Sequence, residues 1–366
     1  MASAIPISRT SRALLSKGDI INGLYQVEKK LGFGTYGDCY KICDIFTKQN
    51  YAFKIIKNEP RYKKKVMEEI KLLHTLNIAD PSLNSNFVIY YDKFIYNNHV
   101  VLVFELLGKD LLEMIKENKY QGFPIEKTRE YCFQILTCLE LLDKLKIIHT
   151  DLKPENIVLD PRTDTLKVID FGSSFFEDGR NRYPIQSSYY RSPDVIIGMP
   201  QTTAIDMWSL GCILYELDTG LPLFAFHNER DILMSQMELF GLPSKSMLNK
   251  SHKEFKKRYF YDNIFKFSCD TKGVERSIGS MSISNKCKSK YPLFLDFISQ
   301  TLSMDPNKRI TPQDALNHPW IMERYEEEYD DDDEDMDDVE ELHCFDTIRE
   351  EDVDLVNTHI ELIQTK

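Results

Sequence analysis

Two short motifs, each with polar residues beside an apolar run, constrain this chain more than any other feature. The first, Ile147 to Leu159, reads IIHTDLKPENIVL, and the second, Leu166 to Gly172, reads LKVIDFG. The side chains in them that can take part in chemistry are Asp151, Lys153, Asn156 and Asp170. A loop that is merely rich in Asp and Lys would not combine both motifs at this spacing. The two motifs therefore indicate a catalytic site.

These four side chains meet the requirements of phosphoryl transfer. That reaction needs a carboxylate to accept the hydroxyl proton, a cation to steady the γ-phosphate, and oxygen ligands for Mg²⁺. We expect Asp151 to be the base and Lys153 to be the cation, with Asn156 and Asp170 as the metal ligands. ATP and Mg²⁺ are the cofactors that this set predicts.

A glycine-rich segment near the N-terminus fits the same chemistry. Gly32, Gly34 and Gly37 follow an expected strand, and their backbone N–H groups could close over phosphates. A dinucleotide-binding segment would need a helix directly after the third glycine. Residues 38–43 instead have the pattern of a strand, which favours a hairpin flap. For this motif alone, an ordinary hairpin turn is the alternative.

Lys54 and Glu69 form a candidate phosphate-binding pair. In a strand over residues 51–56, Ala52 and Lys54 share a face, where Ala52 can cover an adenine while the ammonium reaches the α- and β-phosphates. A lone lysine in a strand is more often a surface group. Glu69 favours the functional interpretation because it lies on the apolar face of the expected helix; Glu68 is the competing register.

The order of the expected elements predicts two lobes. The expected strands are residues 24–31, 38–43, 51–56 and 100–104. One helix lies between residues 60 and 77, and after about residue 110 the apolar period becomes helical. This order predicts an α+β fold, with a small β-rich lobe before a larger helical lobe. The expected parts are an N-terminal extension (1–24), a catalytic domain (25–320, with lobes 25–107 and 108–320) and an acidic tail (321–366).

Charge is distributed unevenly along the chain. Residues 321–366 hold 20 acidic and 3 basic side chains, so the overall net charge of −12 leaves +5 for residues 1–320. Residues 249–290 are weakly patterned and carry a net charge of +7, and we call them the basic insertion. The run from Glu326 to Glu341 is too polar to fold alone. A solvated tail is the simple interpretation, and a binder of basic proteins is the alternative.

The composition also bears on where the protein acts. No stretch approaches eighteen uninterrupted apolar residues, and the N-terminus lacks a secretory signal. We expect an intracellular monomer, in the nucleus or the cytoplasm, without membrane or direct nucleic-acid contact. The eight cysteines are scattered and form no CxxC pair, so we expect reduced thiols.

Over residues 20–322 the chain resembles the eukaryotic protein kinases. The resemblance implies a two-lobed fold with ATP in the cleft, Phe104 as gatekeeper, Glu105 to Leu107 as the hinge that binds adenine, and Val158 beneath the base. Cys39 stands where valine is usual. The expected nucleotide-binding residues are Gly32, Gly34, Gly37, Cys39, Ala52, Lys54, Glu105, Leu107 and Val158, and the expected catalytic residues are Asp151, Lys153, Lys54 and Glu69.

Within these kinases, the sequence is similar to two branches of the CMGC group. Residues 104–108 (FELLG), 149–156 (HTDLKPEN) and 60–62 (PRY) are similar to the LAMMER kinases. Residues 170–174 (DFGSS), 185–187 (IQS) and 198–200 (GMP) are closer to the dual-specificity tyrosine-phosphorylation-regulated kinases. The sequence leaves the choice between the two branches open.

Two departures from the family pattern concern regulation. Thr150 stands where many kinases have an arginine, and Pro184 stands where the tyrosine-regulated kinases have an autophosphorylated tyrosine. Tyr183 is one residue away and would need a shifted register. We therefore do not expect activity to depend on a phosphate at residue 184.

The resemblance implies a Ser/Thr kinase acting on protein substrates, basic ones among them, with tyrosine autophosphorylation as a further activity. Ser187 is expected to reach both Asp151 and Lys153, which is the Ser/Thr-type arrangement. The alternative is a pseudokinase that works as a scaffold. It would be favoured by the loss of Lys54, Asp151, Asn156 or Asp170, and all four are present.

Overall fold

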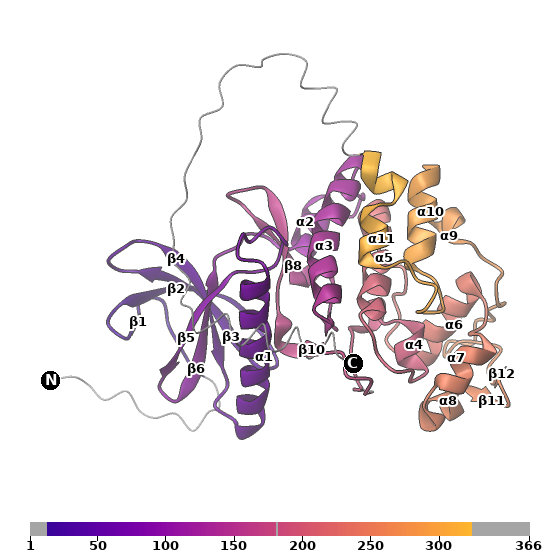
Figure 1. The fold of residues 1–366 in the computed structure, drawn as a ribbon, viewed down its shortest axis with the longest axis horizontal. Coiled ribbons are helices and arrows are strands. Elements are labelled where there is room, and N and C mark those ends of the chain that lie inside the picture. Colours follow the sequence, from indigo (N-terminus) through magenta and orange to yellow (C-terminus); the bar gives the residue numbers. More distant parts are fainter. Residues whose placement is uncertain (1–12, 181, 324–366) are drawn as a thin grey trace, which may run out of the picture.

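The N-terminal lobe is an antiparallel sheet with one long helix beside it (Figure 1). The computed structural model describes residues 13–180 and 182–323. Along the sheet the strand order is β1-β2-β3-β4-β6-β5. Their bounds are β1 Ile20–Ile21, β2 Tyr25–Phe33, β3 Gly37–Asp44, β4 Asn50–Ile56, β5 Tyr90–Tyr96 and β6 His99–Glu105, and the helix is α1 Pro60–Ala79. The strands and helix expected from the sequence are all present.

Strand alternation determines which side chains face the other lobe. Phe53 and Val103 belong to a cluster of buried apolar residues on one face of the sheet. Leu102 and Phe104 belong to the main core, which includes α1 and the C-terminal lobe. Lys54 pairs with Leu102 across the sheet and lies on this second face. The lysine is therefore directed towards the junction of the lobes.

The C-terminal lobe is mainly helical, which confirms the α+β fold. Its helices are α2 Leu111–Glu117, α3 Ile125–Lys144, α4 Pro193–Ile196, α5 Ala204–Thr219, α6 Glu229–Phe240, α7 Lys245–Lys250, α8 Lys253–Tyr259, α9 Ile283–Lys286, α10 Pro292–Thr301 and α11 Pro312–Leu316. Three antiparallel strand pairs join them: β7 Ile147–Ile148 with β10 Phe175–Phe176, β8 Ile157–Asp160 with β9 Thr165–Val168, and β11 Phe260–Tyr261 with β12 Ile264–Phe265. Short 3-10 turns cover Pro154–Asn156, Phe171–Ser173 and Ser188–Tyr190. In Figure 1 the long helices α3 and α5 lie side by side, and they contact each other at the centre of the lobe.

The basic insertion is a folded part of this lobe, although its sequence is weakly patterned. Tyr259 and Phe260 are buried in an apolar cluster with Ile232 and Leu233 of α6. The carboxylate of Asp231, also in α6, accepts a hydrogen bond from the Thr271 backbone N–H at 2.9 Å. These contacts attach the insertion to α6.

Ordered structure extends slightly beyond the expected bounds of the catalytic domain. Strand β1 precedes residue 25, and Leu15 packs against the same sheet face. At the other end Ile321 is fully buried, and Glu323 forms an ion pair with Arg129 at 2.7 Å. The acidic run from Glu326 to Glu341 lies outside the described residues. The boundaries themselves stay predictions.

Two general features concern the whole described chain. Within residues 13–180 and 182–323, no helix is long and apolar enough to cross a membrane. The seven cysteines in these residues are all free thiols. Cys344 lies outside the described part.

Candidate active site

The loop between β7 and β8 brings Asp151, Lys153 and Asn156 together. The Lys153 ammonium lies 2.7 Å from Asp151 Oδ2. The buried Asn156 amide donates to the Asp151 backbone carbonyl at 2.8 Å. Ser187 completes the group, because its hydroxyl donates to Asp151 Oδ1 at 2.7 Å and lies 3.3 Å from Lys153 Nζ. The structure thus makes the contacts of Ser187 that the sequence predicts.

Asp206 of α5 holds the backbone that leads into this loop. Its buried carboxylate accepts hydrogen bonds from the backbone N–H groups of His149, at 2.7 Å, and of Thr150, at 3.0 Å. Burial raises the pKa of Asp206 to about 6, although both N–H groups oppose the shift. Thr150 has φ +71°, a left-handed conformation that costs a β-branched residue about 1–3 kcal/mol. The two hydrogen bonds hold it there, directly before Asp151.

Lys54 lies between two carboxylates at the nucleotide end of the site. Its ammonium is 2.6 Å from Glu69 Oε1 and 2.8 Å from Asp170 Oδ1. Glu68, the competing register, is exposed and lies 3.9 Å from Lys64. A side chain at Gly172 would approach Lys54 Nζ to 3.2 Å, so glycine leaves room for this group. Glu69 is therefore the partner of Lys54 in this structure.

Lys54 and Asp170 shift each other's pKa. Burial alone would lower the pKa of Lys54, but the carboxylates of Asp170 and Glu69 outweigh it and raise that pKa. The Lys54 charge in turn lowers the pKa of Asp170 to about 2. At neutral pH the site therefore presents an ionised carboxylate next to a charged ammonium. Asp170 is in the left-handed region, with φ +63°.

The two halves of the site are joined through the backbone. Ile169 N–H donates to the Asn156 carbonyl at 2.9 Å, which places Asp170 directly after the residue that contacts the catalytic loop. The His149 ring lies 3.0 Å from the Ile169 carbonyl and packs edge-on against Phe171, with ring centroids 5.2 Å apart. All of the expected catalytic and metal-binding side chains thus converge on one site.

The expected adenine-binding residues come from both lobes. Ala52 is paired across the sheet with Phe104, and Cys39 with Lys54. Burial raises the pKa of the Cys39 thiol to about 11, so the thiol is neutral. Val158 lies in β8 of the other lobe and is buried. These positions leave only apolar or neutral side chains for a flat base.

The hinge contains a side-chain network that the sequence does not predict. The Glu105 carboxylate is buried and lies 2.8 Å from Lys167 Nζ and 2.7 Å from Arg162 Nη2. It also accepts a hydrogen bond from the Ile89 N–H at 2.8 Å. Glu105 is thus available to adenine only through its backbone. Leu107, two residues later, is partly buried.

The three glycines of the flap, Gly32, Gly34 and Gly37, differ in what surrounds them. A side chain at Gly37 would approach the Ile55 carbonyl oxygen to 2.2 Å, so glycine there permits the close approach of β3 and β4. At Gly32 a side chain would meet no atom within 4 Å. The Gly34 N–H donates to the Gly37 carbonyl at 2.8 Å, which closes the hairpin. The flap is therefore a hairpin, as expected, and only Gly37 is required by packing.

Beside the catalytic loop lies a hollow of about 340 Å³ that the sequence did not indicate. It is lined by Leu112, Tyr120, Glu155, Ser187, Ser188, Tyr189, Tyr190, Glu216 and Pro222. Burial raises the pKa of Glu216 to about 7, and the Tyr190 hydroxyl donates to its carboxylate at 2.7 Å. Two carboxylates among aromatic rings, next to Ser187, form a surface suited to a cationic side chain.

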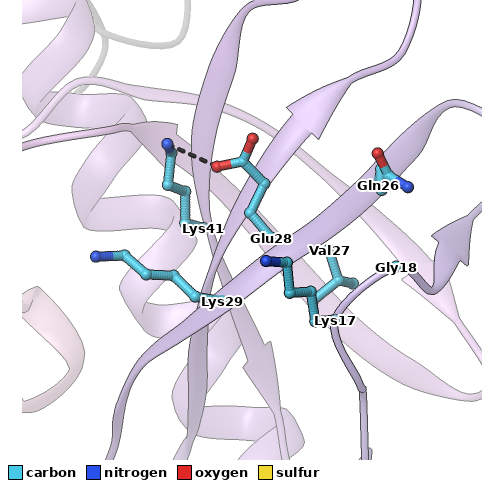
Figure 2. A pocket seen from close by; sticks show the side chains of 7 residues that line it. All are labelled: Lys17, Gly18, Gln26, Val27, Glu28, Lys29 and Lys41. Carbon is cyan, nitrogen blue, oxygen red and sulfur yellow. Dashed lines mark ion pairs between the residues drawn. The ribbon is translucent and has the colours of Figure 1, made fainter.

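A second hollow, of about 550 Å³, lies over strands β2 and β3 (Figure 2). Lys17, Lys29 and Lys41 border it, and Lys41 pairs with Glu28 at 2.6 Å. None of the predicted site residues lines it. Within residues 13–180 and 182–323, no group of three or more His, Cys, Asp or Glu side chains is arranged to hold a metal ion. The assignment of Asn156 and Asp170 as metal ligands stays a prediction.

Comparison with known proteins shows the family of the chain. The protein kinase domain family matches residues 25–321. The chain is 40% identical over 302 residues to dual specificity tyrosine-phosphorylation-regulated kinase 2 of Drosophila melanogaster, which covers 81% of this chain and 41% of the relative. It is also 40% identical over 301 residues to dual specificity tyrosine-phosphorylation-regulated kinase 4 of Homo sapiens. That match covers 81% of this chain and 57% of the relative. Identity to the DYRK-family kinase pom1 of Schizosaccharomyces pombe is 41% over 307 residues, covering 83% and 28%.

These matches also decide between the two branches. The chain spans about 28% to 57% of the length of these three relatives. Their names favour the tyrosine-phosphorylation-regulated branch over the LAMMER kinases. The chain therefore belongs to the protein kinase domain family, and within it to the group of the dual-specificity tyrosine-phosphorylation-regulated kinases.

Proposed function

We propose that this chain is an active protein kinase that transfers the γ-phosphoryl group of ATP to Ser and Thr hydroxyls of proteins. Tyrosine autophosphorylation is a second activity, which the names of the relatives suggest. The observation that carries the proposal is the convergence of Asp151, Lys153 and Ser187 with the Lys54 group. A scaffold that had lost catalysis would have no need to retain this complete arrangement.

The side chains have distinct roles in this proposal. Asp151 accepts the proton of the substrate hydroxyl, and Lys153, 2.7 Å from it, steadies the transferred group. Lys54, oriented by Glu69, holds the α- and β-phosphates. Asn156 and Asp170 would hold Mg²⁺, and an ionised carboxylate with an amide oxygen suits a cation that prefers oxygen. When bound, Mg²⁺ neutralises the phosphate charge.

We also propose that the substrates include proteins with a basic residue near the acceptor hydroxyl. The support comes from the hollow that contains Glu155 and Glu216 and reaches Ser187. Ser187 contacts the base directly, so a chain lying over it would bring an acceptor hydroxyl close to Asp151. A guanidinium could then meet carboxylates and aromatic faces in the same hollow.

Replacing the base tests the phosphotransfer proposal. Asp151→Asn should retain nucleotide affinity but lose turnover by about 10²-fold or more, because it removes the proton acceptor and no nucleotide ligand. Transfer from radiolabelled ATP to a generic basic protein measures turnover, and titration with a fluorescent nucleotide measures affinity. Asp164→Asn, an exposed change in the β8–β9 turn, is the matched control.

The wild-type chain decides between kinase and scaffold. Transfer by wild type and Asp164→Asn, together with loss in Asp151→Asn, supports the proposal. A variant Asp151→Asn that keeps more than half of the wild-type rate would show that the base is misassigned. Nucleotide binding without any transfer by the wild-type chain would favour the scaffold.

A further inference from the structure

One carboxylate outside the catalytic loop holds two side chains that flank Ser187 in the chain, Tyr183 and Arg191. Glu229, the first residue of α6, accepts a hydrogen bond from Arg191 Nη1 at 2.7 Å through Oε1. The same oxygen accepts from the Tyr183 hydroxyl, and Oε2 accepts from Tyr259 at 2.9 Å. The Arg191 and Glu229 side chains are only 12% and 16% exposed. Partly buried pairs of this kind are weakly screened by salt.

The remaining donors of Arg191 hold the backbone just before Ser187. Its Nε donates to the Ile185 carbonyl at 3.0 Å, and its Nη2 donates to the Gln186 carbonyl at 2.7 Å. Ser187, the next residue, donates to the catalytic Asp151. A continuous series of contacts therefore runs from Glu229 through Arg191 to the base.

Gln186 adds a second attachment at the same point. It has φ +59°, a left-handed conformation, and its N–H donates to the Thr150 carbonyl at 2.9 Å. Its side-chain amide donates to the Ile205 carbonyl at 3.0 Å and to Ser209 at 2.9 Å. This conformation costs energy, so it persists only where the surroundings hold it. Arg191 supplies part of that restraint through the Gln186 carbonyl.

The segment reaches this arrangement without any added charge. Pro184 has no hydroxyl to modify, and Thr150 uses its own hydroxyl to donate to the Ser173 carbonyl at 3.1 Å. The charge of Arg191 is already balanced by Glu229. A phosphate on Tyr183 would place further negative charge against that carboxylate, and like charges in contact repel.

We propose that Glu229 is a positioning residue, which acts through Arg191 to hold residues 185–187 so that Ser187 meets Asp151 in the unmodified chain. The inference rests on the proposed phosphotransfer function. In this inference, residues 185–187 are ordered by a contact with α6, and no modification is needed.

Kinetics of phosphatase-treated protein test this inference. Wild type, shown by mass spectrometry to lack phosphate on residues 182–192, should be active. Glu229→Ala should lower kcat/KM for a peptide by about tenfold or more, as expected for loss of a charged hydrogen bond. KM for ATP should stay within about twofold, because Lys54 and Asp170 do not contact this group.

Two further variants separate positioning from general damage to the fold. Tyr259→Phe removes the contact to Oε2 and leaves the segment untouched, so its peptide kinetics should match wild type within about twofold. Arg191→Ala should resemble Glu229→Ala, and the double variant should lose no more than either single one. Glu229→Gln preserves size and one acceptor oxygen, and should fall between wild type and Glu229→Ala.

Hydrogen exchange gives a readout that does not need activity. Amides of residues 185–190 should exchange faster in Glu229→Ala than in wild type, and at the wild-type rate in Tyr259→Phe. Peptide kinetics of Glu229→Ala within twofold of wild type, unchanged exchange, or additive losses in the double variant would each overturn the inference. If wild type transfers no phosphate at all, the proposed function fails, whereas the exchange comparison still decides whether Glu229 orders the segment.

Discussion

At the residue scale, the nucleotide end of the site depends on a lysine held between two acids. Glu69 is almost fully buried, so its oxygen can hold Lys54 in one position. Asp170 is more exposed, with 42% of its side chain accessible, so a ligand can reach it. The Lys54 ammonium thus contacts both the buried Glu69 carboxylate and the more exposed Asp170 carboxylate.

Removing Lys54 and removing Asp170 should each abolish turnover, by different routes. Lys54→Met removes the phosphate clamp, and Asp170→Ala removes a proposed metal ligand. Both variants should stay folded, with turnover at least about 10²-fold lower, measured as transfer to a peptide over a range of Mg²⁺ concentrations. Glu68→Gln, exposed beside Glu69, is the matched control and should behave as wild type. Normal Mg²⁺-dependent turnover by Asp170→Ala would contradict the metal assignment.

The acidic hollow predicts a pH dependence in substrate binding. Because the pKa of Glu216 is raised to about 7, its carboxyl is mostly neutral at pH 6 and mostly ionised at pH 8. KM for an arginine-containing peptide should therefore fall as pH rises across this range, by roughly threefold or more. KM for a matched neutral peptide should change less, and Glu216→Gln should remove the difference. Equal pH profiles for both peptides in wild type would exclude this role of Glu216.

How far the sequence predicts such residues depends on how local their signals are. Asp151, Lys153 and Asn156 lie within six residues of one another, so their spacing alone indicates their chemistry. Glu229 meets Arg191 from 38 positions away, and no local pattern marks either of them. Contacts of that kind follow from the packing of α6 beneath the segment, which only the folded chain reveals.

At the scale of elements, helix α5 connects the catalytic loop to the rest of the helical lobe. Its Asp206 holds the loop at one end, and the Ala204 carbonyl accepts a hydrogen bond from Arg309 at 2.6 Å. The Arg309 side chain is fully buried and also pairs with Asp194 of α4 at 2.9 Å. Arg309 therefore connects α4 to the start of α5.

Breaking this buried pair should destabilise the domain strongly. Asp194→Ala leaves a buried guanidinium without its carboxylate, which typically costs about 3–5 kcal/mol. Urea unfolding followed by circular dichroism measures the change in the free energy of unfolding. The control is Glu254→Ala, which removes an exposed pair with Lys257 and should cost less than about 1 kcal/mol. Similar losses of unfolding free energy in the two variants would show that the buried pair stabilises the domain no more than the exposed pair does.

Elements also differ in how well their sequence predicts them. Local patterns predict strands β2, β3, β4 and β6 and helix α1, whereas no such pattern predicts β1 or β5. The basic insertion has no such periodicity, because its order comes from contacts with α6. Arg276 pairs with Glu238 at 2.7 Å, and Thr271 meets Asp231, from positions about 40 residues away. Its fold was therefore not predictable from local pattern.

At the scale of the whole molecule, the charge of the chain is divided between its parts. Figure 1 shows α7, α8 and the hairpin of β11 and β12 together at the end of the C-terminal lobe farthest from the sheet. Lys253, Lys257 and Arg258 of α8 are exposed there. Phe255 of the same helix packs edge-on against Tyr183, with ring centroids 4.7 Å apart. The basic surface thus adjoins the segment that leads to the active site.

The acidic run should compete with the active site for basic substrates, because its carboxylates attract cationic peptides. Residues 326–341 contain 13 carboxylates, whereas residues 1–320 have a net charge of +5. A short flexible tether raises the effective concentration of such a segment to about the millimolar range. Truncation after Arg324 should therefore lower KM for a basic peptide at low salt and leave KM for a neutral peptide unchanged. The effect should fade as the Debye length shrinks from about 10 Å at 0.1 M to about 3 Å at 1 M salt.

The matched control keeps the full length but replaces the 13 carboxylates with Asn and Gln, and it should behave like the truncation if charge is the cause. Equal KM values for all three proteins with both peptides at both salt concentrations would leave the run with no part in substrate selection, as a merely solvated tail requires.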